Sequence, residues 1–288
     1  MTILTPSEMA QWERLRFTPR KTFSARTRGE RLTRQKGTSI EFADYRDYSD
    51  GDDLRHLDWT ILARLGRPTI RTYQDEAELP VYLAVDVSPS MNFGDPTKLE
   101  HAQRLAEALG FIALAGGDRL QTMAIGASPV QPARPLRGRG SFLVLHDWVT
   151  SLRPNGTRPL AQSLSRLPAL APGLLLLISD GLDPEAAGAL RSISARGHEL
   201  AMVQVLSPIE IDPDLEGDLR LVDSETGAAV EITAHSQTLQ IYKRNLEEHC
   251  RVLAEAVNKL GGRLLLSPAG QPLDDFLASG LRRVGLVE

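Results

Sequence analysis

Three oxygen-bearing side chains stand at alternate positions near residue 90, in the stretch LAVDVSPSMNFGD (83–95). They are Asp86, Ser88 and Ser90, and a run of apolar residues comes directly before them. Carboxylate and hydroxyl oxygens suit Mg²⁺, which prefers octahedral oxygen coordination at about 2.1 Å and usually keeps several waters. One carboxylate and two hydroxyls hold such an ion weakly, so a metal site here requires further oxygen ligands from other parts of the chain.

Two further side chains meet this requirement. Asp180 follows the apolar run LLLLIS (174–179), and Thr157 lies in the glycine-containing turn of PNGTRPL (154–160). Ligands of parallel α/β sheets bind at the carboxyl ends of the strands, near the point where the strand order reverses. The sequence therefore predicts one site for Mg²⁺ or Mn²⁺ that includes Asp86, Asp180 and Thr157 together with the two serines.

Each of these residues also has a purely structural interpretation. Ser88 and Ser90 can satisfy backbone groups in the turn after the strand, and Thr157 can cap the helix that follows it. The pair Asp180–Gly181 is common in turns. We favour the metal site because all five side chains are expected at the correct strand ends.

The elements that must position these side chains are predicted from about residue 80 onward. Short apolar runs alternate with helical patterns there, as in a parallel sheet covered by helices on both faces. The run 130–136 contains Pro132 and Pro135, which cannot donate ladder hydrogen bonds, so we expect an antiparallel edge strand in a tight hairpin with 119–127. The predicted fold is an α/β, doubly wound, mostly parallel, Rossmann-like six-stranded sheet with strands at 81–87, 119–127, 130–136, 174–179, 200–206 and 263–267.

Start and stop signals place the predicted helices. Asp95 and Pro96 predict the start of a helix that ends near residue 115, and Asp183 with Pro184 predicts another that ends at Gly197. A longer helix is expected over 236–260, where apolar residues recur at three- and four-residue steps. Two short alternating runs within 218–233 predict a β-hairpin ahead of this helix.

Composition restricts the class of protein. The chain has 288 residues, 42% of them hydrophobic and 24% charged, with a net charge of −4, which is typical of a soluble globular protein. Its single cysteine, Cys250, excludes an internal disulfide and any cysteine-cluster metal site. The N-terminus has no signal-peptide pattern, and the longest apolar run (173–179) is too short to cross a bilayer. We expect a cytoplasmic protein without membrane spans.

The first eighty residues differ from the rest in charge. Residues 13–37 carry nine Lys or Arg side chains and two acids, whereas residues 41–58 carry seven acids and two arginines. The basic block, with Arg26 and Arg28 at its centre, is either an arm that binds nucleic-acid phosphates or a solvated surface paired with the acidic block. We favour the second interpretation, so nucleic acid is an unlikely partner.

The metal-site residues resemble a known motif. D-x-S-x-S, a threonine after a glycine turn and S-D-G after a later strand are similar, in this order, to the metal-ion-dependent adhesion site of von Willebrand factor type A domains. The resemblance implies a von Willebrand factor A-like fold. It also implies that Asp86, Ser88, Ser90, Thr157 and Asp180 hold a divalent cation, which accepts a carboxylate from a partner protein.

A second resemblance involves EFADYRDYSDGDDLRHLDWTILARLGRPTIRTYQDE (41–76), which is similar to the signature of the bacterial domain-of-unknown-function family 58. The resemblance extends from about residue 25 to the C-terminus and includes LVDSETGAAVEI and GGRLLLSPAGQPLDDFL. It implies an N-terminal extension (1–79) packed on a von Willebrand factor A-like domain (80–288) with a hairpin insertion at about 207–233. Members of this family often accompany MoxR-type AAA+ ATPases, which implies an ATPase partner and a role in protein assembly or activation.

We therefore expect a non-catalytic, metal-dependent protein-interaction module. The sequence lacks G-x-x-x-x-G-K-[ST], G-x-S-x-G and H-E-x-x-H motifs, and Ser88 stands where a phosphoryl-transfer hydrolase using Asp86 would need a second acid. The alternatives are a Mg²⁺-dependent hydrolase with Asp86 and Asp180 on the metal and a base from 44–58, or a nucleic-acid binder.

The signature segment itself is open to two interpretations. In the first it is a structural clamp, with its arginines and acids paired around apolar anchors. In the second its carboxylates reach the metal of a neighbouring copy and give self-association. We favour the clamp, with its anchors at Tyr45, Tyr48, Leu54, Leu57, Trp59 and Ile61.

Overall fold

The structure, a computed structural model, describes residues 4–23, 41–74, 78–126, 130–155 and 158–288. The chain divides into two compact units, one of Met1–Phe23 with Leu79–Glu288 and one of Ser24–Glu78. The segment expected as a single N-terminal extension, 1–79, is thus shared between the two units. Its first 23 residues belong to the larger one.

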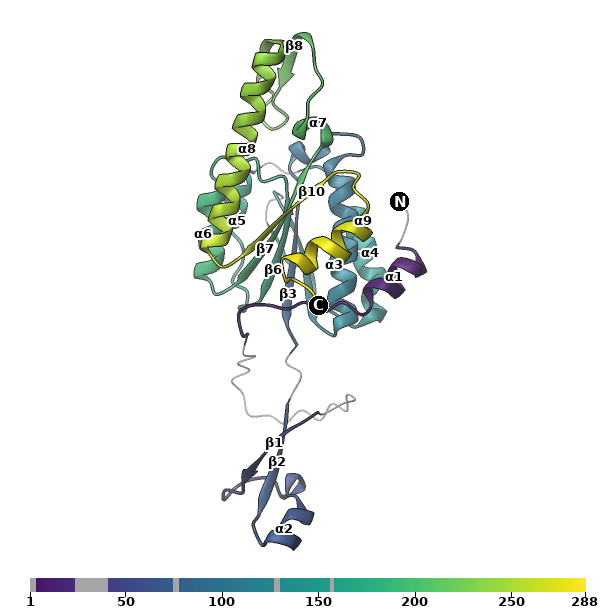
Figure 1. Cartoon of the computed structure of the whole chain (residues 1–288), viewed down its shortest axis with the longest axis vertical. Helices are drawn as coiled ribbons and strands as arrows, with labels where there is room; N and C mark the ends of the chain where they lie inside the picture. The colour runs from purple at the N-terminus through teal and green to yellow at the C-terminus, as the bar shows by residue number, and fades with distance from the viewer. Residues whose placement is uncertain (1–3, 24–40, 75–77, 127–129, 156–157) are drawn as a thin grey trace. The chain divides into compact units, whose positions relative to one another are not determined.

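The larger unit is built on a six-stranded sheet (Figure 1). The strand order is β10-β7-β6-β3-β4-β5, and all neighbours are parallel except β4 and β5. The prediction of a doubly wound, mostly parallel sheet with one antiparallel edge strand is confirmed. The strands are β3 (Pro80–Asp86), β4 (Arg119–Ile125), β5 (Leu136–Arg137), β6 (Leu174–Ser179), β7 (Glu199–Leu206) and β10 (Arg263–Pro268).

The edge strand differs from the prediction. Of the described residues 130–137, only Leu136 and Arg137 pair with β4, so the expected strand at 130–136 and its tight hairpin are wrong. Pro132 and Pro135 lie in the connection between β4 and β5, where their missing N–H groups break no ladder. The Ala133 N–H between them still donates to the Thr122 carbonyl at 2.8 Å.

Helices cover both faces of the sheet (Figure 1). On one face α3 (Lys98–Gly116) is the main element, with α1 (Pro6–Trp12), α4 (Phe142–Ser151), α9 (Leu273–Asp275) and the π-helical segment η4 (Phe276–Leu281) beside it. On the other face lie α5 (Leu160–Ser165), α6 (Ala186–Ala195) and α8 (Ser236–Lys259). Among the described residues, no helix has the length and apolar character needed to cross a membrane.

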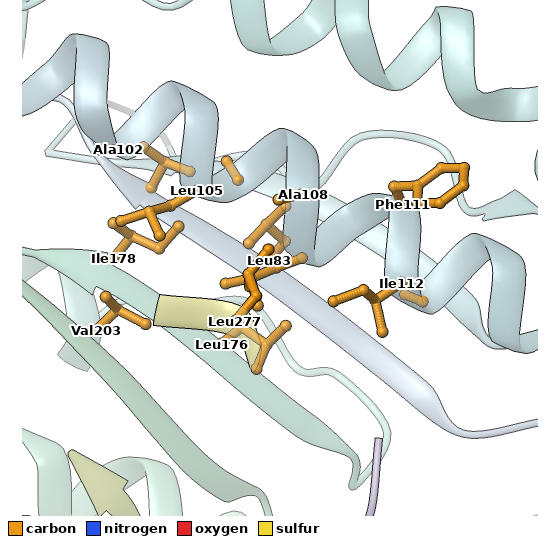
Figure 2. Packing of buried hydrophobic residues seen from close by; sticks show 14 of the residues in the cluster. Leu83, Ala102, Leu105, Ala108, Phe111, Ile112, Leu176, Ile178, Val203 and Leu277 are labelled. Atoms are coloured by element: carbon orange, nitrogen blue, oxygen red, sulfur yellow. The ribbon is translucent and has the colours of Figure 1, made fainter. Parts of the chain in front are cut away.

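Alternate residues of the buried strands supply the two core layers, because successive side chains of a strand point to opposite faces. Val81, Leu83 and Val85 of β3 pack toward α3, whereas Tyr82 and Ala84 pack toward α6 and α8. Figure 2 shows the first layer, in which side chains of α3 meet those of the sheet and of η4. The labelled residues are Leu83, Ala102, Leu105, Ala108, Phe111, Ile112, Leu176, Ile178, Val203 and Leu277.

The start of α3 differs from the prediction. Its N-cap is Thr97, whose hydroxyl accepts from the Glu100 N–H while the Glu100 carboxylate accepts from the Thr97 N–H. This capping box satisfies two free N–H groups of the first turn, so the helix begins two residues after the predicted Asp95–Pro96 start.

A hairpin joins the sheet to the long helix α8. After β7 the chain forms α7 (Pro208–Ile211), and then β8 (Gly217–Val222) pairs antiparallel with β9 (Ala229–Ala234), where the sequence predicts a hairpin. Nearly all hairpin residues are exposed, and β9 leads directly into α8.

The smaller unit contains an antiparallel pair of strands, β1 (Glu41–Asp47) and β2 (Thr69–Gln74), with η1 (Leu54–His56) and α2 (Trp59–Leu65) between them. The Asp58 carboxylate caps α2 by accepting from the Thr60 and Ile61 N–H groups. Of the six apolar anchors expected in this segment, Leu57 is buried, whereas Tyr45, Leu54 and Trp59 are exposed.

Candidate metal site

The candidate site lies where the strand order of the main sheet reverses. The chain passes from β3 to its neighbour β4 on one side and from β6 to its neighbour β7 on the other. Crevices of this kind, at the carboxyl ends of parallel strands, are the usual ligand sites of open α/β sheets. Asp86 is the last residue of β3, and Asp180 directly follows β6.

The structure brings four of the five predicted ligands together. Asp86, Ser88, Ser90 and Asp180 line one cleft of about 660 Å³. The fifth, Thr157, lies outside the described residues.

The Asp86 carboxylate is held in a fixed orientation. Its Oδ1 accepts from the Ser88 N–H at 2.9 Å, and its Oδ2 accepts from the Ser179 hydroxyl at 2.6 Å. The Ser88 and Ser90 hydroxyl oxygens are 3.0 Å apart. Asp86 and Ser88 are buried and Ser90 is half-buried, so the motif runs from the sheet toward the mouth of the cleft.

The buried carboxylates of the site favour a positive charge close to them. Burial, and then the negative charge of Asp180, raise the pKa of Asp86 to about 6, although hydrogen bonds from Ser179 and Ser88 oppose the rise. Two carboxylates that repel each other in a buried position are stabilised when a cation lies beside both.

A lysine that the sequence analysis missed supplies part of this charge. The Lys98 ammonium donates to Asp180 Oδ2 at 2.8 Å and to Glu210 Oε1 at 2.6 Å, and the side chain is 1% exposed. Burial lowers the pKa of Lys98, but the two carboxylates raise it by more, so the net pKa is raised. The available signal was the position of Lys98 on the same face of α3 as the buried Ala102 and Leu105.

The loop that carries Asp180 is fixed by neighbouring elements. Asp180 Oδ1 accepts from the Leu182 N–H at 3.2 Å, and the Asp180 carbonyl accepts from the Gln204 amide of β7 at 2.9 Å. Gly181 has a φ of +64°, which glycine adopts without strain, and its carbonyl lies 2.7 Å from His249 Nε2 of α8. Asp180 is therefore positioned by β7 and α8 as well as by its own strand.

The residues present fit a hydrated divalent cation. Within the described part of the chain, no group of three or more His, Cys, Asp and Glu side chains is placed to hold a metal ion. A cation here would depend on Asp86, Asp180 and the hydroxyls of Ser88 and Ser90, with water completing its coordination. Such a set of hard oxygen donors suits Mg²⁺ or Mn²⁺ and excludes a soft-metal centre.

The tip of the β8–β9 hairpin reaches the same cleft. Val222, Asp223, Ser224, Glu225 and Thr226 line it together with the predicted ligands. Burial, followed by the charges of Asp180, Asp223 and Asp183, raises the pKa of Glu225, and a hydrogen bond with Ser90 opposes the rise. Sequence pattern alone gave no signal for this approach, because it depends on the tertiary path of the hairpin.

The acids of 41–58 lie in the smaller unit and have local partners. Asp52 forms two hydrogen bonds with Arg46, at 2.6 Å each, and Asp53 binds Arg55 at 2.6 Å. The expected pairing of arginines and acids in this segment is thus confirmed for these four residues.

Most of the predicted basic arm falls in a part of the chain that the structure does not describe. Residues 24–40, which include Arg26 and Arg28, lie outside the described residues. Of the preceding residues, Lys21 lies within the larger unit, where its ammonium donates to the His198 carbonyl at 2.8 Å and its N–H donates to Glu199.

Comparisons with known proteins identify the family. The model of the family "Protein of unknown function DUF58" matches residues 44–251. The uncharacterized protein Rv1480 of Mycobacterium tuberculosis is 30% identical over 269 residues, which cover 90% of this chain and 84% of that protein. Similar solved structures include BatB from Bacteroides thetaiotaomicron (15% identity, TM-score 0.45, 71% of this chain and 98% of that one) and the VWA domain of SpRpn10 (12% identity, TM-score 0.40, 70% and 94%). The chain belongs to the DUF58 family.

Proposed function

We propose that this protein is a non-catalytic, cation-dependent protein-interaction module whose metal site binds an acidic side chain of a partner. One observation carries the proposal. Asp86, Ser88 and Ser90 at the end of β3 and Asp180 after β6 line a single open cleft at the switch point of the sheet.

The charge balance of the site favours a carboxylate as its external ligand. The predicted set contains only two acids, Asp86 and Asp180, and Asp180 is already paired with the Lys98 ammonium. A divalent cation bound here would therefore keep much of its positive charge, and a cation of this kind attracts an anionic oxygen into any coordination position that water occupies.

The proposed partner is a MoxR-type AAA+ ATPase, with the pair assembling or activating another protein in the cytoplasm. Membership of DUF58 supports this part of the proposal, because members of the family often accompany such ATPases. Association by family supports this partner class and leaves the client protein open.

The hydrolase alternative finds less support. It draws its general base from residues 44–58, and these belong to the smaller unit, where Asp52 and Asp53 are paired with arginines and Asp58 caps α2. In the larger unit, Glu210 shares the Lys98 ammonium with Asp180 and is held by this ion pair.

Thermal unfolding with and without Mg²⁺ or Mn²⁺ tests the cation site. We expect the cation to raise the melting temperature of the parent protein by several degrees, because it binds only the folded state. Asp86→Ala should abolish this shift, whereas the matched control Asp147→Ala, at an exposed position on α4, should preserve it. A parent protein that gives no response to either cation would refute the site.

Affinity capture tests the partner. The tagged chain, incubated in bacterial lysate with Mg²⁺, should retain a MoxR-type ATPase that mass spectrometry identifies and that EDTA releases. Asp86→Ala should fail to capture it. Retention of the ATPase after chelation would contradict a cation-bridged contact.

A further inference from the structure

We propose that Glu225, at the tip of the β8–β9 hairpin, is a built-in carboxylate ligand of the cation site, and that a partner's acidic side chain binds by displacing it. This inference rests on the proposed function, since it requires that the site hold a cation. It adds a residue to the site that the adhesion-site motif does not contain, and it makes the hairpin the gate of the site.

The turn at the hairpin tip has a defined shape. The Asp223 carboxylate accepts from the Glu225 N–H at 2.8 Å and from the Thr226 N–H at 2.7 Å. The Gly227 N–H donates to the Asp223 carbonyl at 2.9 Å. These bonds are formed within the turn itself, so the tip presents Glu225 in one backbone conformation without help from the rest of the protein.

The Glu225 side chain lies at the mouth of the cleft. Glu225 lines the cleft together with Asp86, Asp180 and Ser90, and Ser90 is the most exposed member of the D-x-S-x-S motif. A carboxylate that lines this cleft is available to a cation held by Asp86 and Asp180, as a partner's carboxylate would be.

The charges around Glu225 favour a cation as its true partner. Asp180, Asp183 and Asp223 all repel its carboxylate. Without a cation, the carboxylates of the hairpin tip and of the neighbouring acids repel one another. A divalent cation in the cleft attracts these carboxylates and stabilises their close approach.

The hairpin is attached weakly enough to be displaced. Most residues of β8 and β9 are exposed, and so is Glu225, so moving the tip sacrifices little buried apolar surface. A partner carboxylate can therefore compete with Glu225 without unfolding the sheet that carries the other ligands.

Cation binding to matched variants tests the inference. Calorimetric titration with Mn²⁺ and Mg²⁺ should show roughly tenfold or more weaker binding for Glu225→Gln than for the parent protein, because a charged ligand becomes neutral at constant shape. Glu231→Gln, an exposed position on β9 of the same hairpin, should bind within about twofold of the parent.

Amide hydrogen exchange supplies a second readout. In the parent protein and in Glu231→Gln, saturating Mn²⁺ should slow exchange across residues 222–229. In Glu225→Gln at saturating Mn²⁺, exchange across the tip should stay at its cation-free rate, even though Asp86 and Asp180 still bind the ion.

The outcomes separate the two proposals. A parent protein that binds neither cation refutes the proposed function and the inference with it. A parent that binds the cation, with Glu225→Gln equal to it in affinity and in tip exchange, overturns the inference alone. Since the tip is exposed and its turn is held by Asp223, we expect the variant to fold, and its circular dichroism spectrum should match that of Glu231→Gln.

Discussion

Asp86 is buried, so its ionised carboxylate is energetically unfavourable. Its pKa of about 6 lies above the ordinary value of 3.8, a difference that corresponds to about 3 kcal/mol. Because the folded state holds the proton more tightly than the unfolded state, protonated Asp86 stabilises the cation-free fold at low pH. This contribution is lost as the pH rises from about 4 to about 6.

Asp86→Asn should therefore stabilise the cation-free protein at high pH. In EDTA at pH 8 we expect its free energy of unfolding to exceed that of the parent by up to about 3 kcal/mol, and at pH 4.5 the difference should shrink to about 1 kcal/mol or less. Urea denaturation at both pH values measures this, with Asp147→Asn as a control that should show no such pH dependence. A variant less stable than the parent at pH 8 in EDTA would contradict the energetic cost that we assign to the Asp86 charge. In excess Mg²⁺ the parent should instead have the larger free energy of unfolding.

Lys98 should be indispensable to the fold. Lys98→Met leaves the carboxylates of Asp180 and Glu210 without their ammonium partner, and breaking a buried ion pair in this way costs about 3–5 kcal/mol. The control Lys243→Met removes an ion pair with Asp212 that is largely exposed, so its cost should be below about 1 kcal/mol. Equal losses in a denaturation experiment would show that Lys98 has no special role.

Local pattern revealed some site residues and hid others, for a physical reason. Asp86, Ser88 and Asp180 were predictable because a strand end fixes where the next few side chains point. Lys98 meets its partners across 82 and 112 residues of sequence, and Glu225 arrives on a separate hairpin, so no periodicity encodes either contact.

At the scale of elements, burial decided which predictions succeeded. The strands β3, β6 and β7 were found because each is a mainly apolar run that is buried on both faces. The edge strand β5 has a neighbour on one side only and contributes two residues, so its apolar pattern constrains it weakly. The cap of α3 was missed because Asp95 and Thr97 are both good capping residues, and only Thr97 has a glutamate three residues on.

The loop after β6 should tolerate a side chain at Gly181 poorly. A Cβ there would stand 2.8 Å from Leu253 Cδ2 and 2.8 Å from Met202 Cε, in a backbone conformation with φ of +64°. Gly117, which ends α3 with a φ of +84°, has nothing within 4 Å of such a Cβ. We expect Gly117→Ala to cost about 1 kcal/mol from its backbone alone, and Gly181→Ala to cost a further 1–3 kcal/mol from crowding, roughly.

This comparison has a second measurement. Because Gly181 adjoins Asp180 and its carbonyl meets His249 of α8, Gly181→Ala should also weaken Mg²⁺ binding, whereas Gly117→Ala should leave it unchanged. Similar stability losses and similar Mg²⁺ affinities in the two variants would contradict the role assigned to this loop.

At the scale of the whole molecule, contacts connect the N-terminal segment to the C-terminal end of the chain. Phe17 pairs with Val287 in an isolated bridge, and the buried Arg263, which binds Glu199, also donates to the Thr18 carbonyl at 3.0 Å. These contacts connect the two ends of the sequence and lie beyond the reach of local pattern. They explain why the first 23 residues belong to the larger unit, although their charge pattern continues into residues 24–37.

The smaller unit should open far more readily than the sheet of the larger one. Among the side chains that the structure describes between 45 and 70, only Leu57 and Ile70 are buried apolar ones, and α2 buries none. So small a core supplies little of the free energy that folding requires. We expect amides of β1 and β2 to exchange with solvent at least about 100-fold faster than those of β3 and β6, measured by hydrogen exchange of the full chain at pH 7.

Comparable protection in the two sets of strands would mean that the unit is stabilised by contacts beyond its own residues. Slowing of this exchange when the ATPase is added with Mg²⁺ would place the signature segment in the proposed interface.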